Sequence, residues 1–375
     1  MISGSARHVA LAILAYAISW PVAPSWAQDA PQESRTQQAY TALQKGDLPA
    51  AEAGFRAALE INRRDIAAHV GLAQVLARLG KTEEAVTSQR NAVALNPLSV
   101  DIRMGLAPIL QQAGRDLDAI AELARCMTYA PGDPRPMVAM VSALQRLSRF
   151  SDARAVGLRA LGIAPDVPAV HQALAELAGT REDWSEAIAH YEAAIRLQPS
   201  LQPLRVAHLG ALSNAGNHAR ARDIARALLV RVPDDVDIRM ALASALEGLH
   251  DRDAAIAEYG KVLEQAPSLA VAWGNLGWTQ YGAGKLQEAL ASSRKALEID
   301  ASLAYVRFNL GLILAVLGQW AEAESEYGKA IAAGDSADLK AGLADVEAAL
   351  KARPDDPNLQ RARELLGAAL AAARR

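Results

Sequence analysis

Nine alanines recur along the chain at an interval of 34 residues without a slip in spacing. They are Ala51, Ala85, Ala119, Ala153, Ala187, Ala221, Ala255, Ala289 and Ala323. Even in a chain rich in alanine, chance does not hold so many positions in phase. A fixed period of this length is typical of proteins built from stacked copies of one supersecondary unit. The chain is therefore predicted to be a repeat array and not a set of independent globular domains.

Each period reads as two helices separated by a turn. Apolar and small residues recur three or four positions apart in both halves of segment 270–303. Glycine, which relieves the backbone at a helix C-terminus, is frequent in the turn. The turn position holds Gly46, Gly80, Gly114, Gly216, Gly284 and Gly318, with Ser148, Glu182 and His250 in the other periods. Six second helices end before a proline, which cannot continue a helix.

The motifs of this period resemble those of the tetratricopeptide repeat family. Trp273-x2-Leu276-Gly277 matches the first-helix motif, and Ala255-x3-Tyr259 followed by Pro267 matches the second-helix motif. The resemblance extends over residues 31–337 and implies an all-α fold, a right-handed α-solenoid of nine helix-turn-helix hairpins. The repeats would occupy residues 28–337 and begin near positions 32, 66, 100, 134, 168, 202, 236, 270 and 304.

Two regions depart from the regular pattern. The fourth repeat has Gly157 in an aromatic position, so a hinge in the array is expected there. Residues 338–375 fall out of phase, with Leu339, Leu343, Val346 and Leu350 on one amphipathic face. Because a terminal repeat needs a cap with a polar outer face, we expect C-terminal capping helices. Basic residues are too few to favour a helix lying on a membrane surface.

Residues 1–27 are predicted to be a cleavable secretory signal peptide. Arg7 supplies positive charge, segment 9–20 is an apolar run too short to span comfortably, and Ser25-Trp26-Ala27 places small residues at the cleavage site. An uncleaved anchor is the alternative. The mature chain would begin at Gln28 and lie in the bacterial periplasm or be secreted. No later apolar run is long enough for a transmembrane segment.

Charge and cysteine content narrow the classes of partner and of chemistry. The chain has 39 Lys and Arg against 42 Asp and Glu, so no basic excess is present to neutralise phosphates, and nucleic acid is not expected as a partner. Cys126 is the single cysteine and permits no internal disulfide. It stands where other repeats have alanine, so we expect a buried, unreactive side chain.

No catalytic motif is present. The chain lacks G-x4-G-K-[ST], H-E-x-x-H and G-x-S-x-G. His69 and His171 occupy the position of Trp273 and are interpreted as packing substitutes. No partner at metal-ligand spacing is evident for His190, His208, His218 and His250. We therefore predict a protein that is not an enzyme, with no catalytic residue, no metal and no cofactor.

Partner binding is expected in a concave groove lined by the first helices, as the resemblance implies. Trp278, Tyr281, Tyr305 and Phe308 fall in ligand positions of repeats eight and nine. Exposed clustered aromatics commonly mark binding sites. The structural alternative is that the segment after residue 338 folds back and buries them.

Polar residues occupy the corresponding positions in the middle of the array. Gln111, Gln112, Gln145 and Arg146 are predicted to hydrogen-bond to an extended chain. Together these features favour a non-catalytic scaffold or adaptor in the bacterial cell envelope that binds a protein or an extended peptide. The alternative is a carbohydrate-binding or polysaccharide-processing or export component whose groove aromatics stack on sugar rings, and an enzyme is the third class.

Export gives the first test. N-terminal sequencing of the mature protein is expected to begin at Gln28, because cleavage would follow the small residue at position 27. An intact chain recovered from the cytoplasm would contradict the prediction.

Overall fold

The computed structural model describes residues 34–334 and 336–373, and the elements of these residues are all α-helices. The predicted signal peptide lies outside the described residues. Two compact units divide between Leu201 and Gln202. We call residues 34–201 the N-terminal unit and residues 202–373 the C-terminal unit, and describe each by itself.

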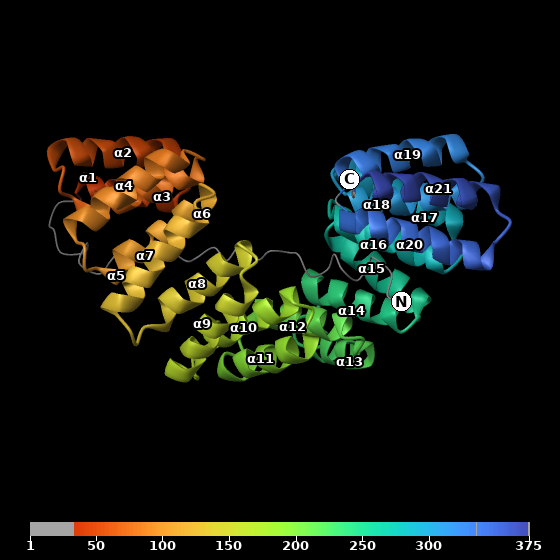
Figure 1. Ribbon diagram of the computed structural model, residues 1–375, viewed down its shortest axis with the longest axis horizontal. Helices are drawn as coiled ribbons and strands as arrows, with labels where there is room; N and C mark the ends of the chain where they lie inside the picture. Colours follow the sequence, from red (N-terminus) through yellow and green to blue (C-terminus); the bar gives the residue numbers. More distant parts are fainter. Residues whose placement is uncertain (1–33, 335, 374–375) are drawn as a thin grey trace. The chain divides into compact units, whose positions relative to one another are not determined.

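The helices of the N-terminal unit form consecutive antiparallel pairs (Figure 1). They are α1 (Arg35–Gln44) with α2 (Leu48–Ile61), α3 (Ile66–Arg78) with α4 (Thr82–Leu95), α5 (Val100–Met104) and α6 (Leu106–Gln112) with α7 (Asp116–Tyr129), α8 (Pro134–Arg146) with α9 (Phe150–Ile163), and α10 (Pro168–Thr180) with α11 (Trp184–Leu197). This pairing is the predicted all-α solenoid architecture.

The C-terminal unit continues the pattern and ends in two further helices. The pairs are α12 (Gln202–Asn214) with α13 (His218–Leu229), α14 (Val236–Gly248) with α15 (Arg252–Gln265), α16 (Ala270–Gly282) with α17 (Leu286–Ile299), and α18 (Ala304–Val316) with α19 (Trp320–Ala333). Helices α20 (Ser336–Ala352) and α21 (Pro357–Ala372) follow and pack on each other and on α18.

The in-phase alanines sit where the two helices of a pair approach most closely. All nine lie in second helices, and each has an exposed fraction of 0%. The facing first-helix position is equally tight. A Cβ added to Gly277 would lie 2.6 Å from Ser293 Oγ and 3.1 Å from the Ala289 carbonyl oxygen. Larger side chains in either position would force the helices apart.

The turns adopt the left-handed backbone that the glycine column predicts. Every one of these positions has positive φ, including the three without glycine: Ser148 at 56°, Glu182 at 59° and His250 at 62°. A side chain in this region is strained, so the packing of the flanking helices imposes the turn where glycine is missing.

The first helix of the third repeat is divided, which the sequence analysis did not anticipate. Helix α5 ends at Met104 and α6 begins at Leu106. Pro108 explains the break, because its ring clashes with the carbonyl four residues earlier and it has no N–H to donate.

The location of any hinge in the fourth repeat stays a prediction, and the contacts of Gly157 show how this irregular position is filled. Leu174 of α10 fills the space beside Gly157, and a Cβ added to that glycine would lie 2.6 Å from Leu174 Cδ2. A leucine from the following repeat thus replaces the missing aromatic ring and keeps α9 and α10 in contact.

Cys126 is buried, as predicted, with an exposed fraction of 0%. Burial raises the pKa of the thiol to about 11. The thiolate, which is the reactive form, is therefore scarce at neutral pH.

A thiol reagent such as DTNB is expected to label Cys126 slowly in the folded protein at pH 7.5 and quickly in guanidinium chloride. The reason is that the reagent can reach the Cys126 thiol, and the thiol can ionise readily, only when α7 opens. Equal rates in the two conditions would show that the side chain is not held in this packed position.

Candidate functional site

The predicted aromatic site does not form an open patch. Trp278 and Tyr281 on α16 stack with ring centroids 5.3 Å apart and an interplanar angle of 28°. Both are half-buried, as is Tyr305 on α18. Phe308 is only 2% exposed. The expectation of an exposed aromatic cluster is therefore wrong for Phe308.

Helix α20 covers Phe308. Gly342 lies so close to Phe308 that an added Cβ would be 2.8 Å from its Cδ1. Leu339, Val346 and Leu350 are buried in the same apolar cluster, against which Trp278 and Tyr281 pack. The amphipathic face predicted for this segment thus packs against Phe308 of repeat nine, as the structural alternative proposed for that residue, while Trp278 and Tyr281 border the same apolar cluster.

One acidic side chain is carried into this apolar contact. Burial raises the pKa of Asp345 on α20 to about 7. Its charge acts on Tyr281 and Tyr327, whose pKa values are raised mainly by burial. The Tyr327 hydroxyl is buried without a hydrogen-bond partner. Ionised Asp345 is thus unfavourable in the docked helix.

The structure brings the four predicted polar residues together in the N-terminal unit. Gln112 Nε2 donates to the Ala77 carbonyl at 2.9 Å, which links α6 to α3. An Arg146 Nη donates to the Gln111 carbonyl at 3.3 Å, which links α8 to α6. These bonds run between the ends of first helices.

The same row of helix ends continues to α10 and is open to solvent. Gln145 Nε2 donates to Thr180 Oγ1 at 3.4 Å, and Arg146 pairs with Asp116 at 2.7 Å. Gln112 and Arg146 remain exposed. The fifth residues of the first helices α3, α5 and α8 are Val70, Met104 and Val138, and all three are half-buried. We call this surface of α3, α5, α6, α8 and α10 the first-helix wall.

A second recurring position links each repeat to the one before it. The fourth residue of many first helices donates to the carbonyl six residues earlier, at the end of the previous repeat. The bonds include Trp273 Nε1 to Pro267 at 2.9 Å, His171 Nε2 to Pro165 at 2.9 Å and His69 Nε2 to Arg63 at 3.1 Å. Both histidines thus occupy the structural position of Trp273 and make the same carbonyl bond.

Arginine also occupies this position, which the sequence analysis missed. Arg103, Arg239 and Arg307 donate to the carbonyls of residues 97, 233 and 301. Each also pairs with a glutamate nineteen residues later on the second helix: Glu122 at 2.5 Å, Glu258 at 2.8 Å and Glu326 at 2.7 Å. The repeated Arg-x18-Glu spacing was a signal that could have revealed these pairs.

His190 has a histidine neighbour that its spacing in the sequence did not indicate. His190 Nδ1 lies 3.1 Å from His171 Nδ1, because α10 and α11 pack with the same nineteen-residue offset. Burial, followed by His171, lowers the pKa of His190. The sequence analysis missed this contact because the two residues are nineteen positions apart in the sequence.

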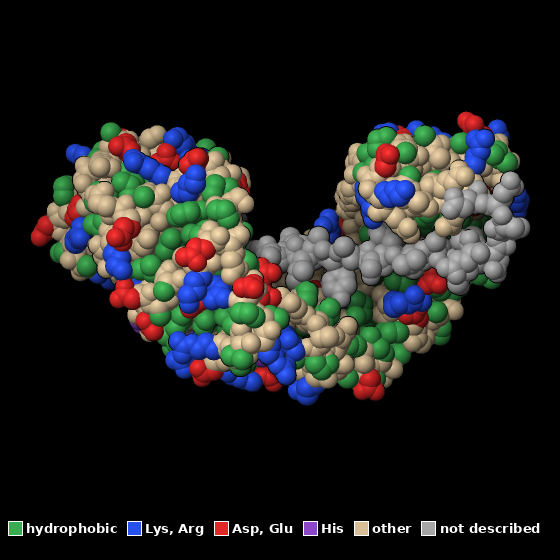
Figure 2. Space-filling model, turned by 180° about the vertical axis from the view of Figure 1, so that it is seen from behind, with side chains coloured by type: hydrophobic (Ala, Val, Ile, Leu, Met, Phe, Trp, Pro, Cys, Tyr) green, Lys and Arg blue, Asp and Glu red, His purple; other side chains and the backbone are tan. Residues whose placement is uncertain are grey.

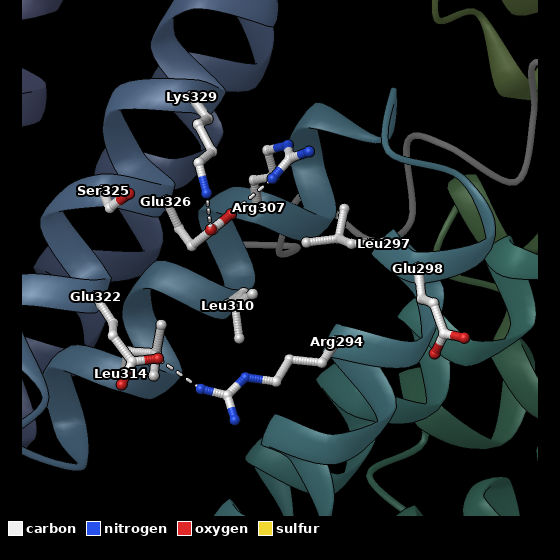
Figure 3. Close-up of a pocket in the computed structure, with 10 residues that line it drawn as sticks. All are labelled: Arg294, Leu297, Glu298, Arg307, Leu310, Leu314, Glu322, Ser325, Glu326 and Lys329. Carbon is white, nitrogen blue, oxygen red and sulfur yellow. Dashed lines mark hydrogen bonds and ion pairs between the residues drawn. The ribbon is translucent and has the colours of Figure 1, made fainter.

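A cavity of about 430 Å³ lies among α17, α18 and α19 (Figure 3). Leu297, Leu310 and Leu314 line its apolar part. Its charged rim is satisfied internally, since Arg294 pairs with Glu322 at 2.6 Å and Lys329 with Glu326 at 2.6 Å. The Arg294 and Lys329 side chains at this rim therefore already have acidic partners.

Charged side chains of both signs are visible on one face of the molecule (Figure 2). On the face drawn in Figure 2, basic and acidic side chains of the described residues are interspersed. Within residues 34–334 and 336–373, no group of three or more His, Cys, Asp or Glu side chains is arranged to hold a metal ion. None of the helices in these ranges combines the length and apolar content needed to cross a bilayer.

A family model for the tetratricopeptide repeat matches residues 36–90, 70–134, 207–270, 240–304 and 275–338. A search of curated proteins finds no match. Among solved structures, a tetratricopeptide repeat protein from Parabacteroides merdae is 16% identical over 75% of this chain and 98% of that chain, with a TM-score of 0.49. Another, from Thermus thermophilus, is 24% identical over 48% of this chain and 98% of that chain, with a TM-score of 0.41.

Asp345→Asn is expected to stabilise the C-terminal unit at pH 8 by on the order of 2 kcal/mol and to have little effect at pH 4. The pKa of the acid is raised in the folded state, so the native protein holds its proton more tightly than the unfolded chain. The contribution of Asp345 to the free energy of unfolding of the wild type is therefore fully present at low pH. It is lost as pH rises from about 4 through about 7.

Urea unfolding at the two pH values measures the difference. Glu347→Gln, on the exposed side of the same helix, is the matched control and is expected to show no comparable pH-dependent gain. An equal effect of Asp345→Asn at both pH values would mean that the carboxyl is solvated and that α20 does not dock as described.

Proposed function

Because the chain belongs to the tetratricopeptide repeat family, we propose that it is a non-catalytic adaptor that binds a protein or an extended peptide along its first-helix wall. The family consists of interaction scaffolds, so the fold supports protein binding in general, while the choice of surface depends on the side chains. The observation that carries the proposal is the difference between the two first-helix surfaces. Phe308 of α18 is buried against α20, whereas Gln112, Ser142 and Arg146 of the N-terminal wall are exposed.

The side chains of the wall suit an extended peptide. Val70, Met104 and Val138 offer spaced apolar contacts, which fit alternate side chains of a strand-like ligand. Gln112 supplies a carboxamide, which both donates and accepts hydrogen bonds and so can pair with peptide backbone. Arg146 already pairs with Asp116, so the wall is not a cluster of free cations selecting a carboxylate.

We also propose that the adaptor works in the cell envelope. The support is the order of charge, apolar run and small residues within positions 1–27. The alternative of a sugar-binding protein depended on open groove aromatics. Its support is weakened, because Phe308 is buried and Trp278 and Tyr281 pack against the cluster that includes α20.

Site-specific photo-crosslinking in cells tests the wall. A photoreactive residue at Ser142, exposed on α8, is expected to trap a discrete protein that mass spectrometry identifies. The matched control is Ala124, exposed on α7 in a second helix, where no such product is expected. The purified partner should then bind the purified chain directly, and Gln112→Ala with Arg146→Ala should weaken that binding. Because both side chains also link neighbouring first helices, circular dichroism at the binding temperature must show that the variant is still folded.

Two outcomes would contradict this proposal. Crosslinking of the partner at Ala124 but not at Ser142 would place binding on the second helices. Equal affinity of the double variant and the wild type for the identified partner would exclude the polar row from the interface.

A further inference from the structure

Two imidazoles from consecutive helices of the N-terminal unit meet nitrogen to nitrogen. His171 on α10 and His190 on α11 have Nδ1 atoms 3.1 Å apart and ring centroids 5.3 Å apart, with an interplanar angle of 44°. Both side chains are half-buried, so solvent can reach the pair. The adaptor function proposed above does not use this pair.

Hydrogen bonding fixes the tautomer of His171. Its Nε2 lies 2.9 Å from the Pro165 carbonyl oxygen, which can only accept, so Nε2 carries the hydrogen. In the neutral ring, Nδ1 then has a lone pair directed towards His190. A backbone carbonyl that holds one ring nitrogen and leaves the other free is the arrangement that orients metal-binding histidines.

We propose that His171 and His190 form a two-imidazole site for a divalent transition-metal ion such as Zn²⁺, bound through both Nδ1 atoms. Two metal–nitrogen bonds of about 2.0–2.1 Å place the nitrogens roughly 2.9 Å apart at a right angle and roughly 3.4 Å apart at the tetrahedral angle. The observed separation of 3.1 Å lies between these limits. Metal binding therefore requires little movement of either helix.

Comparison with the other repeats shows that this pair is an exception. The same two positions, nineteen residues apart, hold complementary ion pairs in repeats three, seven and nine, such as Arg103 with Glu122. In repeat two, His69 is followed by Ser88, whose hydroxyl donates to the His69 carbonyl. Two imidazoles cannot form an ion pair, and if both were protonated they would repel each other. Without metal, the neutral rings can share a hydrogen bond between their Nδ1 atoms, and a bound cation would take the place of that shared hydrogen.

One acidic and two basic side chains stand near the pair. The Glu186 carboxylate lies one turn before His190 on α11 and acts on it, but it is paired with Arg154 at 2.9 Å and with Arg181 at 3.6 Å, and Arg154 opposes a positive charge. A neutral imidazole is the form that binds a metal ion, so binding is expected to weaken as pH falls. With two protein ligands, the remaining coordination positions belong to water.

The test uses metal-free full-length protein without a histidine tag, titrated with ZnSO₄ by isothermal calorimetry at pH 7.5. One Zn²⁺ per chain is expected, with binding lost at pH 5.5 because protons compete for the imidazoles. Zn²⁺ should also raise the melting temperature of the wild type. Absence of saturable binding would overturn the proposal.

The chain supplies matched variants. His171→Gln removes the imidazole but retains a donor for Pro165, since Gln360 Nε2 donates at the same spacing to Pro354 at 2.9 Å. His190→Ser copies the serine of repeat two. Each variant is expected to lose at least about tenfold in Zn²⁺ affinity and the Zn²⁺-dependent rise in melting temperature.

His69→Gln is the control, because His69 makes the same carbonyl bond without a second imidazole, and it should bind Zn²⁺ as the wild type does. Circular dichroism without metal shows whether each variant is folded. If one of the two histidine variants does not fold, the other one alone tests the site. Wild-type affinity in a folded His171→Gln or His190→Ser protein, or a loss in His69→Gln equal to theirs, would refute the site.

Discussion

Close contact between the two helices of each repeat is the constraint on which the rest of the structure depends. A methyl group is the largest side chain that the second-helix position admits, as shown by nine alanines with no exposed surface. Where the facing residue is glycine, even a Cβ would collide with the opposite helix. Interiors packed at this density tolerate little added volume. The helix spacing then sets the offset at which side chains from the two helices meet, nineteen residues apart in the pairs described.

Because of this offset, the fourth residue of the first helix makes contacts of several chemical kinds. The fourth residue of the first helix closes the end of the preceding repeat by donating to a carbonyl, and Trp, His, Arg and Gln all do so. Its second contact, across the pair, is an arginine–glutamate bridge in some repeats and a histidine pair in one. Partly buried bridges of this kind contribute more to alignment of the helices than to net stability, since desolvation offsets much of the attraction.

The C-terminal helices show how the array limits its own binding surface. A regular first-helix row would leave Phe308 exposed, but α20 lies against it and contributes Leu339, Val346 and Leu350 to the same cluster. Gly342 permits this approach because it has no Cβ to meet the ring. Burying apolar surface ends the stack without an exposed hydrophobic face. The cost is an ionisable carboxyl, Asp345, held among aromatic rings.

The sequence by itself determined the repeat, its helix pairs and the left-handed turns, because these follow from local periodicity and backbone sterics within one repeat. It also placed Cys126, His69 and His171 in positions that other repeats fill with packed side chains, because the same environment recurs in each repeat. It did not determine which predicted site residues remain accessible. Burial of Phe308 and the meeting of His171 with His190 were decided by tertiary structure. Phe308 is buried by α20, which lies outside the repeat period. The offset that joins His171 to His190 recurs along the chain, but only the packing of the paired helices shows that residues nineteen positions apart are in contact.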